Sequence, residues 1–207
     1  MIPVKILAVR YLANASRELT KSFGTPEGYA SLGLITTDSD DPTYIALDEA
    51  TKAADVKVSY GRSFYAGAGN ATTPYAGEVI GILAGATPGA VRSGMEAAVS
   101  ALQRVGFEEV NGVPYLAHTV SSCGTYLAEA AGVETGSALA YLIAPPLESM
   151  YAMDAALKAA DVKLCKLFTP PSETNFGGGL LSGTQSACDA ACSAFAAAVA
   201  EVANQPR

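Results

Sequence analysis

The stretch ALDEATKAADVKV at residues 46–58 recurs as AMDAALKAADVKL at residues 152–164, with nine identities in thirteen positions at an offset of 106. The similarity extends outward, since Gly33-Leu34-Ile35 corresponds to residues 141–143 at an offset of 108. Apolar positions with helical spacing between residues 91 and 105 return 97 residues later. Self-similarity on this scale indicates an internal repeat, so the chain is predicted to contain two related halves.

Each half shows short alternating strand and helix patterns, which favours an α+β (α/β sandwich type) fold, one small sheet with helices per half. Expected strands are 4–10, 31–37, 55–60, 78–84, 115–121, 139–144, 161–167 and 178–182. Expected helices are 15–23, 43–53, 88–105, 123–130, 148–159 and 185–203. The predicted domains are 1–108 and 109–207, with about nine extra residues between 60 and 77 of the first half. Thr87 and Thr184 are expected to be N-caps.

Composition excludes several classes of protein. The formal charge of the 207 residues is -7, which gives no basic surface for nucleic acid. The least charged stretch, 63–91, is interrupted by Gly, Thr, Asn and Pro, so no membrane span is expected there. The sequence opens without a leader pattern, which suggests a cytosolic protein. The four cysteines are expected to be thiols, with Cys188 and Cys192 at core positions of a helix.

Two groups of residues suggest chemistry besides a structural role. His118 is the only histidine and stands five residues before Cys123, so the two could form a nucleophilic pair, although a structural histidine is favoured. The glycine clusters Gly67–Asn70 and Gly177–Gly183 lack the flanking residues of a nucleotide loop. They predict either turns or a pair of movable loops.

A set of acids points to a cation site. Asp41 before Pro42 is expected to be an N-cap, which leaves Asp38 and Asp40 without a local role. Glu78 is isolated in an uncharged stretch, and its counterpart 97 residues later is Asn175. Carboxylates and an amide together suit an ammonium group or a hydrated metal ion. The second half has Pro-Pro-Leu at 145–147 in place of the acids, so such a pocket would occur once per chain.

Several motifs carry a resemblance to a known family. They are SLGLI at 31–35, DSDD at 38–41, TYIA at 43–46, YGRS at 60–63, APPLE at 144–148 and PPSETN at 170–175. In this order they resemble the L-type shell proteins of ethanolamine-utilisation bacterial microcompartments. The resemblance implies two tandem, circularly permuted microcompartment domains, each a small antiparallel-rich sheet flanked by helices. It further implies a flat homotrimer of pseudohexameric shape that fits among other shell proteins of the microcompartment, inside the bacterial cytoplasm.

The same resemblance implies functional residues. Ethanolamine would be bound by Asp40 and Glu78, with Phe107, Thr174 and Asn175 completing an acidic pocket. A gated central pore for metabolites and cofactors would be formed by two loop segments, which contain Arg62, Phe64, Tyr65, Phe176, Gly177 and Gly178. No catalytic residue, resident metal or required cofactor is implied, although some members interact with cobalamin.

Two other functions remain compatible with the residues. A soluble sensor for cobalamin or an amine would bind its ligand tightly without forming sheets or entering a shell. A small acid-base enzyme would use Asp40 and Glu78, or Cys123 as a nucleophile with His118. Assembly into planar arrays separates the shell protein from both alternatives.

Overall fold

The computed structural model describes residues 1–64, 77–170, 172 and 174–207. Within them the chain forms two compact units. The first unit consists of Pro3–Val105 together with Gly124–Leu127. The second consists of Met1–Ile2, Gly106–Cys123 and Ala128–Arg207. A short piece of the second half of the sequence therefore belongs to the first unit.

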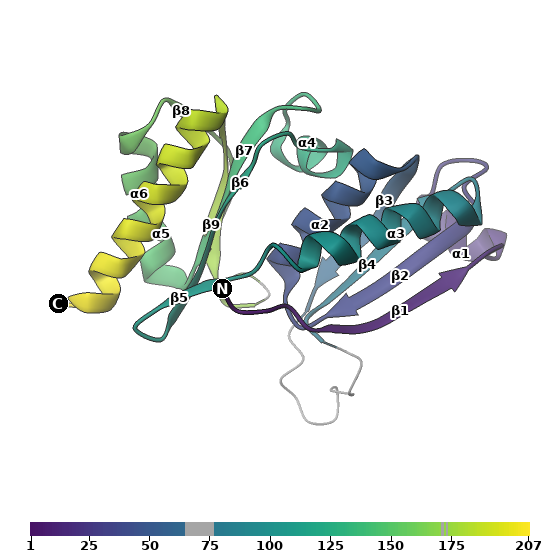
Figure 1. Ribbon diagram of the computed structural model, residues 1–207, viewed down its shortest axis with the longest axis horizontal. Coiled ribbons are helices and arrows are strands. Elements are labelled where there is room, and N and C mark those ends of the chain that lie inside the picture. Colours follow the sequence, from purple (N-terminus) through teal and green to yellow (C-terminus); the bar gives the residue numbers. More distant parts are fainter. Residues whose placement is uncertain (65–76, 171, 173) are drawn as a thin grey trace. The chain divides into compact units, whose positions relative to one another are not determined.

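The first unit is a four-stranded antiparallel sheet with two helices along one face (Figure 1). Its strands, in the spatial order β1-β2-β4-β3, are β1 (Ile6–Leu12), β2 (Ser31–Thr37), β4 (Val79–Gly85) and β3 (Val56–Ser63). Its helices are α1 (Arg17–Ser22), α2 (Asp40–Ala53) and α3 (Pro88–Leu102). The longer helices α2 and α3 pack against each other and against the sheet.

The core of the first unit lies between the sheet and these two helices. Ile35, Leu83, Val91 and Met95 are buried there, so the helical and strand periodicities of the sequence meet at one apolar layer. Gly33 of β2 lies directly beneath α3, where an added Cβ would lie 2.8 Å from a methyl group of Val91. Close approach of the helix explains why this strand position holds glycine.

The second unit repeats this plan and adds one strand. Its strands, in the order β5-β6-β7-β9-β8, are β5 (Glu108–Val110), β6 (Val113–Val120), β7 (Ala138–Ala144), β9 (Gly177–Gly183) and β8 (Val162–Phe168). Its long helices are α5 (Pro146–Ala159) and α6 (Gln185–Asn204), which lie side by side on one face of the sheet (Figure 1). Helix α4 (Thr125–Ala131) follows β6, and its first three residues belong to the first unit.

The repeat is visible in the strand register. In the first unit the pairing of β3 with β4 shifts between Val58 and Tyr60. In the second unit the pairing of β8 with β9 shifts between Leu164 and Lys166, again 106 residues later. A bulge at the same place in both sheets fixes the correspondence of the two halves residue by residue. The α+β fold with antiparallel sheets is thus confirmed.

Local expectations were mostly met. Thr87 and Thr184 cap α3 and α6, since each hydroxyl accepts a hydrogen bond from a backbone N–H three residues later, at 3.1 and 3.2 Å. The prediction that Asp41 is an N-cap was wrong, because α2 begins at Asp40 and its N-cap is Ser39. The Asp40 carboxylate accepts a hydrogen bond from the Asp41 N–H at 2.9 Å, so both acids lie in the first turn.

Helix α6 is long and apolar enough to cross a membrane by composition alone. Its apolar residues have a place in the second unit, where Phe195, Val199 and Cys188 are buried against the sheet and α5. The hydropathy of α6 is therefore explained by packing in a protein core.

Candidate functional site

Strand pairing brings the predicted acids to one end of the first sheet. Thr37, the last residue of β2, pairs with Val79, the first residue of β4. Asp38 directly follows Thr37, and Glu78 directly precedes Val79, so the two acids are neighbours in space. The Glu78 N–H donates to the Thr37 carbonyl at 2.9 Å and fixes this arrangement. The pairing of distant strands, rather than any local motif, creates the acidic end.

The turn from β2 into α2 is held by hydroxyl groups. The Thr37 and Thr43 hydroxyls lie 2.7 Å apart, and both interact with the Ser39 carbonyl. Asp38 accepts a hydrogen bond from the Lys5 N–H at 2.8 Å, which ties the turn to the segment before β1. Threonine and serine are suited to such turns because their hydroxyls satisfy nearby backbone groups. Asp40 is therefore held in place by hydrogen bonds of the residues before it and after it in the sequence.

The electrostatics of this end favour a cation. Burial of part of the carboxyl group, and then the negative charges of Asp40 and Asp38, raises the pKa of Glu78. Asp40 is buried, while Glu78 lies at the exposed start of β4. Like charges at close range are relieved by an opposite charge between them. Asp40 and Glu78, which the sequence paired, are thus brought within electrostatic reach of each other.

The remaining predicted pocket residues belong to the second unit. Phe107 and Phe176 pack edge to face, with ring centroids 5.7 Å apart. Asn175 has a positive φ of 66° and donates its N–H to the Ser172 carbonyl at 3.0 Å. The Ser172 hydroxyl lies 3.4 Å from that of Thr174. Phe107, Thr174 and Asn175 therefore gather around one turn before β9.

The predicted gate residues lie next to these acids and this turn in the sequence. Arg62 is an exposed residue of β3, and Phe64 follows that strand with its N–H bonded to the Glu78 carbonyl at 3.0 Å. Tyr65, Gly67–Asn70 and Tyr75 lie outside the described residues. Gly177 and Gly178 are buried residues of β9 and pair with Ala144 and Ile143.

The second glycine cluster is therefore strand β9, which the expected strand at 178–182 anticipated, and not the turn or movable loop that the glycines also suggested. Gly178 has a φ of 146°, and an added Cβ there would collide with the Leu142 carbonyl. At Gly177 an added Cβ would lie 2.8 Å from the Ser149 hydroxyl. Close packing explains the glycine at 177, whereas both the positive φ and the nearby carbonyl explain the glycine at 178.

The cysteines and the histidine that the sequence singled out lie in strands, helices and the core. The Cys123 thiol donates to the Glu134 carbonyl at 3.7 Å and is buried, while His118 is a residue of β6 opposite Tyr141. Cys188 and Cys192 are buried core residues of α6, and burial raises the pKa of both thiols, that of Cys192 to about 11. Among the described residues no three His, Cys, Asp or Glu side chains are arranged to hold a metal ion.

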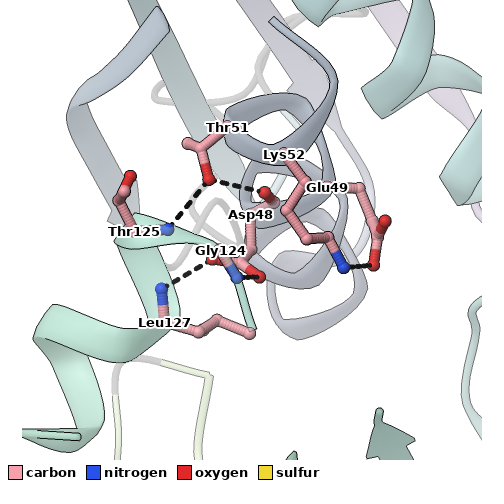
Figure 2. A network of polar contacts seen from close by, with 7 residues as sticks. All are labelled: Asp48, Glu49, Thr51, Lys52, Gly124, Thr125 and Leu127. Atoms are coloured by element: carbon pink, nitrogen blue, oxygen red, sulfur yellow. Dashed lines mark hydrogen bonds and ion pairs between the residues drawn. The ribbon is translucent and has the colours of Figure 1, made fainter. Parts of the chain in front are cut away.

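Sequence reasoning missed one network of polar contacts in the first unit (Figure 2). The fully buried Asp48 of α2 accepts hydrogen bonds from the N–H groups of Gly124, at 2.6 Å, and Leu127, at 2.8 Å. The Thr51 hydroxyl accepts from the Thr125 N–H at 3.0 Å. Burial raises the pKa of Asp48, although these N–H groups oppose that change. A side chain from α2 therefore caps α4, a helix more than seventy residues away in sequence.

The chain is similar to known proteins in sequence and in structure. The model described as "BMC domain" matches residues 31–114, from β2 to the beginning of β6. The bacterial microcompartment shell protein EutL of Clostridium perfringens is 57% identical over 210 residues, which cover 100% of this chain and 97% of that protein. EutL of Escherichia coli K12 is 47% identical over 210 residues, covering 100% and 96%.

Solved structures agree. The crystal structure of EutL from Leptotrichia buccalis superposes with a TM-score of 0.95 at 55% identity and covers 99% of this chain and 96% of that one. EtuB from Clostridium kluyveri has a TM-score of 0.82 at 21% identity over 96% of this chain and 88% of that one, which shows a shared fold.

Two sheet-and-helix units of the BMC type define the chain as a shell protein of bacterial microcompartments. Its role is structural and not enzymatic, and its place in the cell is the microcompartment shell in the cytoplasm. More narrowly, the chain belongs to the EutL family of ethanolamine-utilisation shell proteins.

Proposed function

We propose that this protein is a trimeric shell tile that binds ethanolamine and controls passage through a central pore. The observation that carries the proposal is the acidic end of the first sheet, where pairing of Thr37 with Val79 makes Asp38 and Glu78 neighbours. Partial burial, and then the charges of Asp40 and Asp38, raise the pKa of Glu78 there. A site with surplus negative charge attracts a small cation. Because the second half lacks these acids, each chain has one such site.

Ethanolamine has the chemistry that this site recognises. Its ammonium group donates hydrogen bonds to the Asp40 and Glu78 carboxylates, and such charge-assisted bonds are strong ones. Its hydroxyl pairs with the Asn175 amide or the Thr174 hydroxyl, while Phe107 packs against its methylene groups.

The proposed gate of the pore comprises the segment with Arg62 and Phe64 and the segment with Phe176. Tyr65 lies outside the described residues, and Gly177 and Gly178 are paired residues of β9. One hydrogen bond and one covalent link support the coupling of the gate to the pocket. The Phe64 N–H donates to the carbonyl of Glu78 itself, and Phe176 directly follows Asn175. A ligand that binds one arrangement of these segments more tightly raises its population. The open arrangement would pass metabolites and bulky cofactors such as cobalamin.

Calorimetric titration with ethanolamine tests the pocket. Wild type is expected to bind, and Asp40→Asn and Glu78→Gln are each expected to weaken binding at least tenfold, because each removes a charged partner of the ammonium group. Asp154→Asn, an exposed acid elsewhere, is the control and should bind as wild type does. Ethanol lacks the ammonium and should not bind. Equal affinity of all four proteins for ethanolamine would overturn the pocket.

A separate measurement tests the tile. Light scattering after size exclusion is expected to give three times the 21.1 kDa chain mass, and electron microscopy is expected to show flat arrays. A monomer or dimer without arrays would contradict the tile and favour a soluble binding protein.

A further inference from the structure

Residues Met1 and Ile2 do not belong to the unit that follows them in the sequence. They are part of the second unit, together with Gly106 and the residues after it, and Figure 1 shows this end of the chain beside β5. The Ile2 N–H donates a hydrogen bond to the Phe107 carbonyl at 2.5 Å. A backbone contact between two segments far apart in the sequence therefore holds the main chain at Phe107.

Gly106 allows these two segments to approach each other. An added Cβ there would collide with the Ile2 carbonyl oxygen and would lie 3.1 Å from the Met1 Cγ. Gly106 is not among the glycines with a positive φ, so the close approach of the other backbone is what favours glycine here. Because Gly106 is buried and the segment 1–2 is exposed, an alanine at 106 would push the segment 1–2 away.

The ring of Phe107 is held from its other end. It packs edge to face against the ring of Phe176, with centroids 5.7 Å apart and an angle of 62° between the planes. Aromatic pairs favour this geometry. The hydrogen bond from Ile2 fixes the backbone of Phe107, and Phe176 fixes its ring. A displacement of the segment 1–2 would therefore reach Phe176 through Phe107.

Phe176 in turn closes the turn before β9. The Ser172 N–H donates to the Phe176 carbonyl at 3.1 Å, and the Phe176 N–H donates to the Ser172 hydroxyl at 3.2 Å. Between them Asn175 has a φ of 66° and donates its N–H to the Ser172 carbonyl at 3.0 Å. A left-handed residue other than glycine persists where its surroundings determine it. The position of Asn175 therefore depends on the position of Phe176.

We propose that Gly106 and Ile2 are positioning residues that make the pocket proposed above selective for the length of its ligand. They hold Phe107 and, through Phe176, the turn before β9. The inference rests on the proposed function, in which Phe107 packs against the methylene groups of ethanolamine. A ring that is fixed in place limits the length of the amino alcohol that fits, whereas a ring that can shift accepts a longer one.

Calorimetric titration with two amino alcohols tests this selectivity. The second ligand, 3-amino-1-propanol, has the same ammonium and hydroxyl groups and one more methylene. Wild type is expected to bind ethanolamine at least about tenfold more tightly, since one methylene in a fitted pocket changes affinity by about that factor or more. Gly106→Ala is expected to reduce this ratio to about threefold or less, because Phe107 loses its hydrogen bond to Ile2.

Gly89→Ala is the matched control. Gly89 is an exposed residue of α3 without a positive φ, and the only neighbouring atom that an added Cβ would meet there is the Thr87 hydroxyl oxygen, at 3.9 Å. The same substitution is therefore free of collisions at this position. Gly89→Ala is expected to keep the wild-type ratio of the two dissociation constants.

Phe176→Leu interrupts the same path at its next contact. It removes the ring that Phe107 packs against and is expected to lower the selectivity as Gly106→Ala does. The double variant is expected to lose no more selectivity than either single variant, because both substitutions act on one chain of contacts. Losses that multiply would show that the two residues act independently and would overturn the proposed path.

Amide hydrogen exchange follows the path without any ligand. The N–H groups of Asn175 and Phe176 are both bonded to Ser172, so their exchange reports whether the turn stays closed. Exchange at both positions is expected to be at least about threefold faster in Gly106→Ala than in Gly89→Ala. Equal rates in these two variants would overturn the path through Phe176.

The outcomes separate this inference from the proposed function. If wild type binds neither amino alcohol, the proposed pocket fails and the selectivity fails with it. If wild type prefers ethanolamine and Gly106→Ala keeps the full preference, the pocket stands and the positioning role of Gly106 is wrong. If circular dichroism shows that Gly106→Ala does not fold, Phe176→Leu decides, and an unchanged preference in that variant would overturn the proposal.

Discussion

The carboxylate of Asp48 lies 2.8 Å from the backbone nitrogen of Leu127 and accepts its hydrogen bond. A helix start exposes N–H groups without partners, and an acid placed there supplies both a partner and a favourable charge. The residue before α4 is Gly124, which has no side chain for this purpose. Asp48 supplies the missing cap from another part of the sequence. Its contribution to stability therefore depends on its buried hydrogen bonds to the start of α4.

Asp48→Ala is expected to lower the free energy of unfolding by about 2–4 kcal/mol, because two buried N–H groups lose their acceptor. Urea denaturation measures this change. Asp154→Ala, at the equivalent repeat position, removes only an exposed pair with Lys158 and is expected to cost at most about 0.5 kcal/mol. Asp48→Asn keeps one acceptor oxygen, so its loss of unfolding free energy should lie between those of the two alanine variants. Equal losses for the two alanine variants would contradict the capping role.

Glu78→Gln is expected to make the ligand-free protein more stable at neutral pH. Partial burial and the charges of Asp40 and Asp38 raise the pKa of Glu78 above its ordinary 4.5, so the folded state holds this proton more tightly than the unfolded state. The contribution of Glu78 to the free energy of unfolding is therefore most favourable below its ordinary pKa of 4.5 and is lost as pH rises through its folded pKa.

Unfolding curves between pH 4 and pH 8 check this linkage. The advantage of Glu78→Gln over wild type should shrink toward pH 4, where wild type is itself protonated. Saturating ethanolamine should reverse the order at neutral pH, because only the carboxylate pairs with the ammonium group. A variant less stable than wild type at pH 8 without ligand would show that no repulsion exists.

Gly61→Ala is expected to cost about 1–3 kcal/mol, because the added Cβ would lie 2.6 Å from the Tyr126 oxygen. Tyr126→Phe removes that atom, so the same substitution should cost less in the Tyr126→Phe background. A double-mutant cycle measured by denaturation is expected to give a coupling of about 0.5–2 kcal/mol. Additive losses would mean that the ring and the strand do not meet at this glycine.

The repeat made most of the fold predictable. Residues 46–58 and 152–164 became α2 with the start of β3, and α5 with the start of β8. The N-caps of α3 and α6 followed from single threonines, because a cap is a local interaction. The hairpin that contains β5 was missed, since three residues carry too little periodicity, although Asn111 and Gly112 both have positive φ there.

The candidate site was predictable only in part. Asp40 was chosen as an acid without a local role and Glu78 as an isolated acid, and the pairing of Thr37 with Val79 explains why Asp38 and Glu78 are neighbours. Asp48 could not be chosen in this way, because its identical twin Asp154 is an exposed surface residue. Identity within a repeat indicates equivalent backbone positions, whereas the environment of each copy depends on what covers it. Gly177 and Gly178 illustrate the same limit, since glycine serves close packing and turns alike.

The bulge in β3 supplies a last prediction. Within the described part of the chain the Ser59 hydroxyl is buried without a hydrogen-bond partner, and its repeat counterpart is Cys165. An unpaired buried hydroxyl costs about 1–3 kcal/mol, so Ser59→Ala is expected to stabilise the protein by about 0.5–2 kcal/mol. Ser182→Ala is the control, because that hydroxyl donates to the Ala138 carbonyl at 3.0 Å and its removal should destabilise instead. Thermal melts that shift in the same direction for both variants would show that Ser59 has found a partner in solution.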